Sequence, residues 1–413
     1  LLKGSPHLQG DAIITHTAVH KTQKHAKLKA LLQCESLDLA LLKKLCFNGC
    51  PDVPGLRSMC WKYLLNYIPT DQRNRADRLD SHRREYAAYV NDFIVESGNN
   101  EVLDHPLNSE PSGSWVNFFK DNEVLQQIHK DCRRICPDFD FFHRKTDYPC
   151  SKVFPGTSVG VLRRRIDSSI LKSNALHQTL NGLTSVVGSD PREPEIQPAD
   201  GRDSRLIDGS EWHWEVIQRI LFIYYKTHTA QGYVQGMNEV IAPIYYLFAT
   251  DPDPAWKRHA EVDAFFCFNN LMIEIHSNFI RHLDDGQLPG IGGQLRLLMR
   301  LLAQFDAPLH DHMDRIGLQP AHFGFRWLSL LLAREFSLPD VLSLWDTLLS
   351  DPMRFAMLPF VCCAMLILIR TQLLDADFPT AVSILQNYPP SVSLMCILST
   401  SKQLYASSGN HLP

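Results

Sequence analysis

The sequence has 413 residues, of which 45% are hydrophobic and 21% are charged, enough for one large globular domain or two average ones. Its net charge of -4 provides no field that would gather nucleic acid, so nucleic acid is not an expected partner. The 11 cysteines include no C-x-x-C pair and no signal peptide is visible, so we expect a cytoplasmic protein with reduced thiols.

The first part of the chain is predicted to be a series of helices joined by loops. Residues 1–43 are interpreted as an N-terminal extension with a helical segment. Gly49 and Pro51 interrupt the pattern with a tight loop, and Pro137 ends a later helix. Apolar residues recur at helical spacing in residues 38–45, 61–67, 79–94 and 122–135.

Residues 173–209 form a polar tract rich in proline and glycine, which we interpret as a disordered insertion. The apolar run 355–369 is too short to span a bilayer and predicts a buried core helix. Residues 401–413 are interpreted as a C-terminal tail. Beyond the insertion, further helices are predicted at 211–227, 260–280, 294–305, 323–336 and 341–349.

These patterns predict an all-α protein in two lobes, one before and one after the insertion, because alternating strand patterns are nearly absent. The sequence contains no G-x-x-x-x-G-K-[ST] loop. If the protein takes part in nucleotide chemistry, we expect it not to hold the nucleotide itself.

One segment places Leu125, Ile128, Asp131 and Arg134 at three-residue steps along a helix face. The inner members would anchor the helix and Arg134 would protrude, with Asp131 close enough to orient its guanidinium. An arginine in a last helical turn also complements the helix dipole, so this segment alone favours a structural role.

A second segment runs from Gly232 to Asn238. Tyr233 and Gln235 share one side if the backbone is extended, and the flanking glycines allow close backbone approach. A plain turn between helices, with glycines serving positive φ angles, also explains the segment and is the favoured interpretation when the segment is taken alone.

Together the two segments resemble the paired signatures of TBC-domain Rab GTPase-activating proteins. I-x-x-D-x-x-R is matched by Ile128, Asp131 and Arg134, and Y-x-Q by Tyr233 and Gln235. The resemblance covers roughly residues 44–350. It includes further residues in the family's order, namely Gly49, Pro51, Arg57, Trp61, Arg326, Trp327, Trp345 and Asp346.

The resemblance implies a two-lobed helical TBC domain over residues 44–400. It also implies a GTPase activator that inserts Arg134 and Gln235 as catalytic residues into a GTP-bound Rab, in vesicle trafficking, and that is not itself an enzyme. Asp131, Tyr233 and Asn238 would support the pair, and Ile128 would only pack. Trp61, Arg57, Trp327 and Trp345 are interpreted as mainly structural.

The resemblance implies no cofactor of the protein's own, because GTP and Mg²⁺ would be held by the partner. His16, His20 and His25 lack further ligands nearby, so no metal site is expected. Recruitment to membranes is expected to be peripheral and transient, through the partner. Two alternatives stay open: a catalytically idle TBC scaffold that binds a GTPase or adaptor, and a helical adaptor unrelated to GTPases.

Overall fold

The computed structural model describes residues 22–94, 114–157, 160–167, 209–279 and 290–409. Within these ranges the chain is helical, and its only β pairing consists of two isolated bridges, Ser36 with Asp71 and Lys145 with Trp212. The all-α prediction is therefore confirmed. The insertion predicted at 173–209 lies outside the described residues except for Gly209.

The described residues form two compact units. Unit 2 runs from His82 to Asn238, whereas unit 1 combines the residues up to Ser81 with those from Glu239 onward. Two lobes were expected and are found. The expected division at the insertion is wrong, because N-terminal helices share their core with the C-terminal part of the chain.

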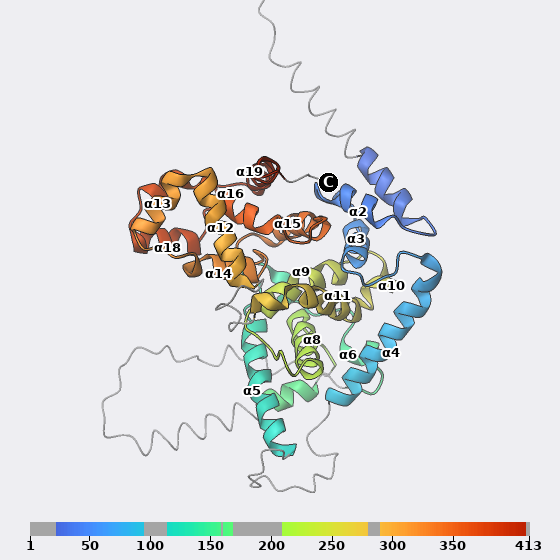
Figure 1. The fold of residues 1–413 in the computed structure, drawn as a ribbon. Coiled ribbons are helices and arrows are strands. Elements are labelled where there is room, and N and C mark those ends of the chain that lie inside the picture. The colour runs from blue at the N-terminus through green and yellow to red at the C-terminus, as the bar shows by residue number, and fades with distance from the viewer. Residues whose placement is uncertain (1–21, 95–113, 158–159, 168–208, 280–289, 410–413) are drawn as a thin grey trace, which may run out of the picture. The chain divides into compact units, whose positions relative to one another are not determined.

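Unit 2 is built around α8 (His213–Thr227), whose residues from Val216 to Tyr225 are all buried. α5 (Ser114–Cys132) packs alongside α8 (Figure 1), and its residues Leu125 and Ile128 are buried. Sequence periodicity predicted α8 as an amphipathic helix, whereas the structure buries it on nearly every side. The other helices of unit 2 are most of α4 (Arg75–Phe93), η2 (Asp140–His143), α6 (Cys150–Val153) and residues 160–167.

Unit 1 contains the remaining helices. Residues 22–32 form its first helix. It continues with α2 (Leu39–Cys46), α3 (Leu56–Leu64), η1 (Gln72–Asn74), most of α9 (Met237–Ala249), α10 (Pro254–Lys257), α11 (Ala260–Ile275) and η4 (His276–Phe279). It ends with α12 (Ile291–Phe305), α13 (Ala307–Arg315), η6 (Pro320–His322), α14 (Gly324–Ser329), α15 (Leu338–Ser350), α16 (Leu358–Leu368), α17 (Arg370–Leu374), α18 (Phe378–Gln386) and α19 (Leu394–Ser407).

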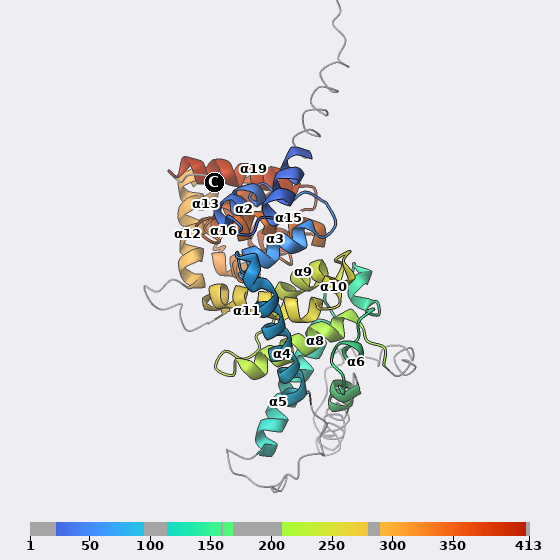
Figure 2. The same ribbon diagram turned by 90° about the vertical axis from the view of Figure 1, so that its right-hand side faces the viewer.

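The core of unit 1 joins both ends of the sequence. α2 and α3 lie beside α15 (Figures 1 and 2), and Trp61 of α3 stacks on Trp345 of α15 with ring centroids 5.8 Å apart. α2 begins directly after Asp38, whose side chain accepts a hydrogen bond from the Leu41 N–H at 3.0 Å and so caps the helix. Local capping and long-range apolar packing therefore both fix this part of the unit.

α16 confirms the predicted buried core helix. It packs against α12 and α19, and Pro359 lies in its first turn, where a missing N–H costs no helical hydrogen bond. No helix among the described residues is long and apolar enough to cross a membrane.

The helix predicted at 323–336 is wrong over its second half. α14 ends at Ser329, and Leu331 and Leu332 adopt positive φ angles of 50° and 60°. Both leucines are buried, so the apolar run that predicted helix is instead a tight turn packed into the core. An apolar run alone does not distinguish these two structures.

Candidate functional site

The two motif segments both belong to unit 2, at the end of α5 and in the loop between α8 and α9. α5 ends at Cys132, and Arg134 lies in the turn that follows, where its backbone N–H donates to the carbonyl oxygen of Asp131 at 3.1 Å. Ile128 is fully buried, and Asp131 is 5% exposed. The buried residues fix the end of the helix, while Arg134 is exposed.

Asp131 connects the two segments. Its Oδ2 atom accepts hydrogen bonds from the Tyr233 hydroxyl at 2.9 Å and from Gln127 Nε2 at 3.0 Å. Its carbonyl oxygen accepts another from Asn238 Nδ2 at 3.3 Å. The first motif is therefore tied to the residues on both sides of Gln235.

Asp131 was expected to orient Arg134, and the structure shows a different arrangement. Its carboxylate contacts Tyr233 and Gln127 and makes no ion pair with Arg134. The reason is that α5 ends before Arg134, so the two residues do not occupy successive turns of one helix.

The loop between α8 and α9, residues 228–236, carries Gln235 and is called the glutamine loop below. Its glycines determine the path of its backbone. Gly232 and Gly236 adopt φ angles of +71° and +105°, which favour glycine because other residues place a Cβ atom against the backbone. The carbonyl oxygen of His228 accepts the N–H of Gly232 at 2.9 Å, and that of Val234 accepts the N–H of Met237 at 3.1 Å. The first bond closes a tight turn that ends just before Tyr233, and the second closes a turn that contains Gln235.

Arg134 and Gln235 share one property that their neighbours lack. Both side chains are exposed, and neither makes a hydrogen bond or ion pair with any described residue. By contrast, the adjacent Arg133 lies over the Trp214 ring, with its guanidinium carbon 5.8 Å from the ring centroid. A guanidinium and an amide held at fixed backbone positions with unused donors are therefore available to an incoming partner.

His129 lies one turn before Arg133 in the contact between α5 and α8. Its Nδ1 atom is 2.9 Å from Oε1 of Gln218, and its ring meets Trp214 edge-on at a centroid distance of 5.3 Å. Burial lowers the pKa of His129 below its usual value, although the hydrogen bond with Gln218 opposes the shift. A neutral histidine thus supports the helix that carries Asp131.

Asp346 lies in unit 1, where five of the remaining motif residues are its hydrogen-bonding partners or neighbours of those partners or of Asp346 in the sequence. Its fully buried carboxylate accepts hydrogen bonds from the Cys50 N–H at 2.6 Å, Arg57 Nε at 3.1 Å and Trp61 Nε1 at 2.8 Å. Gly49 has a φ of +81°, Pro51 follows Cys50, and Trp345 precedes Asp346 in α15. Arg57 and Trp61 bind Asp346, and Trp61 stacks on Trp345, which supports the structural interpretation of these three residues.

Arg326 and Trp327 also have structural partners in unit 1. Arg326 forms two parallel hydrogen bonds with the Glu335 carboxylate, at 2.7 and 2.8 Å, and a third with the Gln386 carbonyl oxygen at 2.9 Å. Trp327 is buried and meets Phe323 and Tyr388 edge-on. Arg326 therefore ties the turn after α14 to the end of α18.

Sequence reasoning missed Gln127, which contacts Asp131. Its four-residue spacing from Asp131 on α5 was a usable signal, because residues i and i+4 lie side by side on a helix.

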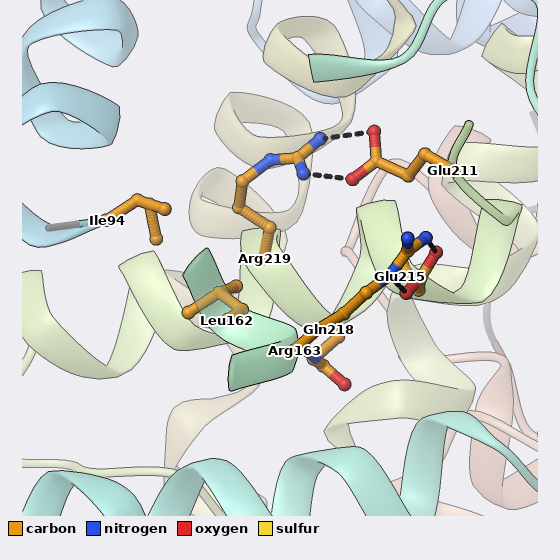
Figure 3. Close-up of a pocket in the computed structure, with 7 residues that line it drawn as sticks. All are labelled: Ile94, Leu162, Arg163, Glu211, Glu215, Gln218 and Arg219. Atoms are coloured by element: carbon orange, nitrogen blue, oxygen red, sulfur yellow. Dashed lines mark hydrogen bonds and ion pairs between the residues drawn. The ribbon is translucent and has the colours of Figure 1, made fainter. Parts of the chain in front are cut away.

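Sequence reasoning also missed a polar cluster in unit 2 in which Arg219 pairs with Glu211, and Arg163 with Glu215 (Figure 3). These charges line a pocket yet neutralise each other, so the pocket offers no unpaired charge for a ligand.

Comparison with known proteins gives one consistent result. A family model described as the Rab-GTPase-TBC domain matches residues 209–374. The chain is 43% identical to human TBC1 domain family member 13 over 94% of this chain and 99% of that protein. It is 30% identical to a TBC domain-containing protein of Schizosaccharomyces pombe over 88% of this chain and 70% of that protein.

A solved structure shares the fold at lower identity. The Ypt/Rab-GAP domain of Gyp1p superposes with a TM-score of 0.64 at 22% identity, covering 94% of this chain and 98% of that one.

Proposed function

We propose that this chain, which belongs to the Rab-GTPase-TBC domain family, acts as a Rab GTPase-activating protein. In this proposal it supplies Arg134 and Gln235 in trans to the nucleotide site of a GTP-bound Rab. One observation carries the proposal. The segments that hold these residues are tied together through Asp131, while the two side chains themselves are exposed and bound to no described residue.

Arg134 would stabilise the transition state of phosphoryl transfer. Negative charge spreads over the phosphate oxygens as the bond to the γ-phosphate breaks, and a planar guanidinium can donate two hydrogen bonds to that charge at once. An ammonium group lacks this fork. Arg134 has no carboxylate partner to compete with the phosphate, because Asp131 is occupied by Tyr233 and Gln127.

Gln235 would position the attacking water. An amide accepts a hydrogen bond through its oxygen and donates through its nitrogen, so it can hold a water in line with the γ-phosphate while donating to a phosphate oxygen. Gln235 lies in the turn closed between Val234 and Met237, which limits the freedom of its backbone and so favours one approach direction. Gln235 would thus take the place of the water-positioning glutamine of the GTPase.

In this mechanism GTP and Mg²⁺ stay with the partner, and the protein is an activator that does not hydrolyse nucleotide by itself. The cellular setting that follows is vesicle trafficking. The protein would act from the cytoplasm and meet membranes transiently, through a membrane-anchored Rab in its GTP-bound state.

The test is single-turnover GTP hydrolysis by a panel of Rab proteins. The wild-type protein should accelerate at least one Rab, and Arg134→Ala should remove roughly 10³- to 10⁵-fold of that acceleration. Arg134→Lys should be severely impaired, and Gln235→Ala should lose activity while still binding the GTP-bound Rab. The matched control is Arg133→Ala, which removes a neighbouring exposed arginine and should retain activity.

Failure to accelerate any Rab would contradict the proposal. The alternative, an idle scaffold that binds a GTPase or adaptor, predicts binding with no acceleration and no difference between the variants.

A further inference from the structure

Three cysteines of unit 1 bring their sulfur atoms together. Cys46, Cys50 and Cys60 are buried, and their Sγ atoms all lie within 4.8 Å of one another. An isolated buried cysteine behaves as a small apolar residue, whereas converging sulfurs form a ligand set for a soft metal ion.

The backbone around these cysteines is fixed from several sides. Cys46 is the last residue of α2, and its carbonyl oxygen accepts the Gly49 N–H at 2.8 Å in the turn that brings Cys50 back towards it. The Cys50 N–H is held by Asp346, and Cys60 comes from the middle of α3. The three sulfurs are therefore positioned by contacts that do not involve a metal.

Positive side chains surround the loop that carries Cys50. Lys24 Nζ donates to the carbonyl oxygens of Asn48 and Gly49, and Lys402 Nζ donates to Oδ1 of Asn48 at 2.6 Å. Arg57 Nη2 donates to the Cys50 carbonyl oxygen at 3.4 Å. Two carboxylates, Asp346 and Asp52, also act at this loop, so the positive and negative side chains around it nearly balance.

We propose that Cys46, Cys50 and Cys60 bind one thiophilic metal ion, Zn²⁺ or Cu⁺, through three thiolate sulfurs. Each ligand releases its thiol proton to solvent, so the complete three-thiolate site carries a charge of -1 with Zn²⁺ or -2 with Cu⁺. Three protein ligands are one fewer than a structural zinc site uses, which favours Cu⁺, whereas the smaller buried charge favours Zn²⁺.

Without metal the three residues are thiols. Hydrogen bonds within the cluster act on their pKa values in both directions, and burial raises the pKa of each thiol. A bound ion replaces those protons and crosslinks the end of α2, the loop and α3, so it should stabilise the folded state.

This proposal departs from the expectation that the protein binds no metal. The C-x-x-x-C spacing of Cys46 and Cys50 is within the range of zinc-ligand pairs, but the third ligand, Cys60, stands alone in the sequence and reaches the cluster because α3 packs beside α2. The site is independent of the GTPase-activating residues, which lie in unit 2.

The test uses the full chain, stripped of metal under reducing conditions and titrated separately with Zn²⁺ and Cu⁺. The expected result is one equivalent of one ion, a higher melting temperature, and an X-ray absorption spectrum with three sulfur neighbours, at about 2.3 Å for zinc. Cys50→Ala and Cys60→Ala should lose the bound equivalent. The matched control, Cys267→Ala, removes a fully buried cysteine outside the cluster and should keep it.

Absence of stoichiometric binding, or a coordination sphere without three sulfurs, would overturn the proposal. The sulfur count is measured on wild-type protein, so it decides the question even if a variant fails to fold.

Discussion

At the scale of single residues, Asp131 is the centre of the candidate site. One carboxylate oxygen accepts two hydrogen bonds, and the carbonyl oxygen of the same residue accepts a third from Asn238. A buried carboxylate costs free energy unless it is hydrogen-bonded, so these donors stabilise its charge. The same bonds hold the glutamine loop against the end of α5.

Tyr233→Phe should therefore lower the rate of stimulated GTP hydrolysis without unfolding the protein. A hydrogen bond to a charged group contributes about 1.5–3 kcal/mol, so we expect a loss of roughly ten- to a hundredfold in kcat if it acts through positioning. The measurement is kcat and KM for the responsive Rab. Tyr67→Phe is the control, because Tyr67 donates to Asp263 at 2.7 Å in unit 1, whereas the motif segments belong to unit 2.

An unchanged kcat in Tyr233→Phe would show that the hydrogen bond from Tyr233 to Asp131 is not needed for activity. Combining Tyr233→Phe with Asp131→Asn tests the same point, because residues that act through one bond give non-additive losses.

His129 predicts a pH dependence of stability. Burial lowers its pKa in the folded state below 6.5, so between the two pKa values the unfolded chain binds more protons than the folded one. The contribution to stability is present above pH 6.5 and is lost as pH falls through the folded-state pKa. Denaturant midpoints measured across this window should decrease as the pH is lowered. His129→Gln should reduce the dependence of the midpoint on pH, whereas His143→Gln, at an exposed histidine, should leave that dependence as in the wild type.

At the scale of elements, most helices follow from apolar spacing and punctuation. α2, α12 and α15 lie where periodicity predicts them. Asp38 caps α2 and a proline lies in the first turn of α15, whereas α12 follows Gly290 without a side-chain cap. α9 and α19 were missed. α9 is apolar almost all round and contains Pro243, so it shows neither clear periodicity nor an uninterrupted pattern.

The candidate site was predictable in part. The motifs identify Arg134 and Gln235, yet the bond between Asp131 and Tyr233 joins residues 102 positions apart, which no local pattern encodes. The expected pairing of Asp131 with Arg134 assumed a helix that continued through both residues, and α5 stops at Cys132. Spacing arguments hold only while the element lasts.

At the scale of the whole molecule, unit 1 is discontinuous in sequence. Its closure depends on contacts across most of the chain, above all those of Asp346 with Cys50, Arg57 and Trp61. Burial raises the pKa of Asp346 despite the nearby guanidinium of Arg57. The ionised carboxylate therefore depends on these hydrogen-bonding partners for its stabilisation.

Arg57→Ala should destabilise the protein by about 3–5 kcal/mol, because it leaves the charge of Asp346 buried and unpaired. Urea denaturation measures the change. The control is Arg370→Ala, which removes an ion pair with Asp306 whose arginine side chain is 43% exposed, against 15% for Arg57, and should cost at most about 1 kcal/mol. Equal losses in the two variants would contradict the role given to Asp346.

This closure also has a consequence for biosynthesis. Cys50 and Asp346 are separated by 296 positions, which a ribosome moving at roughly 5–20 residues per second covers in about 15–60 s. Throughout that interval α2 and α3 are in the cell without α15, and Trp61 lacks the ring on which it stacks. Unit 2 is contiguous in sequence, so all of its residues are synthesised before α15 and it can fold during this interval. The nascent N-terminal segment is therefore a natural client for chaperones until translation reaches α15.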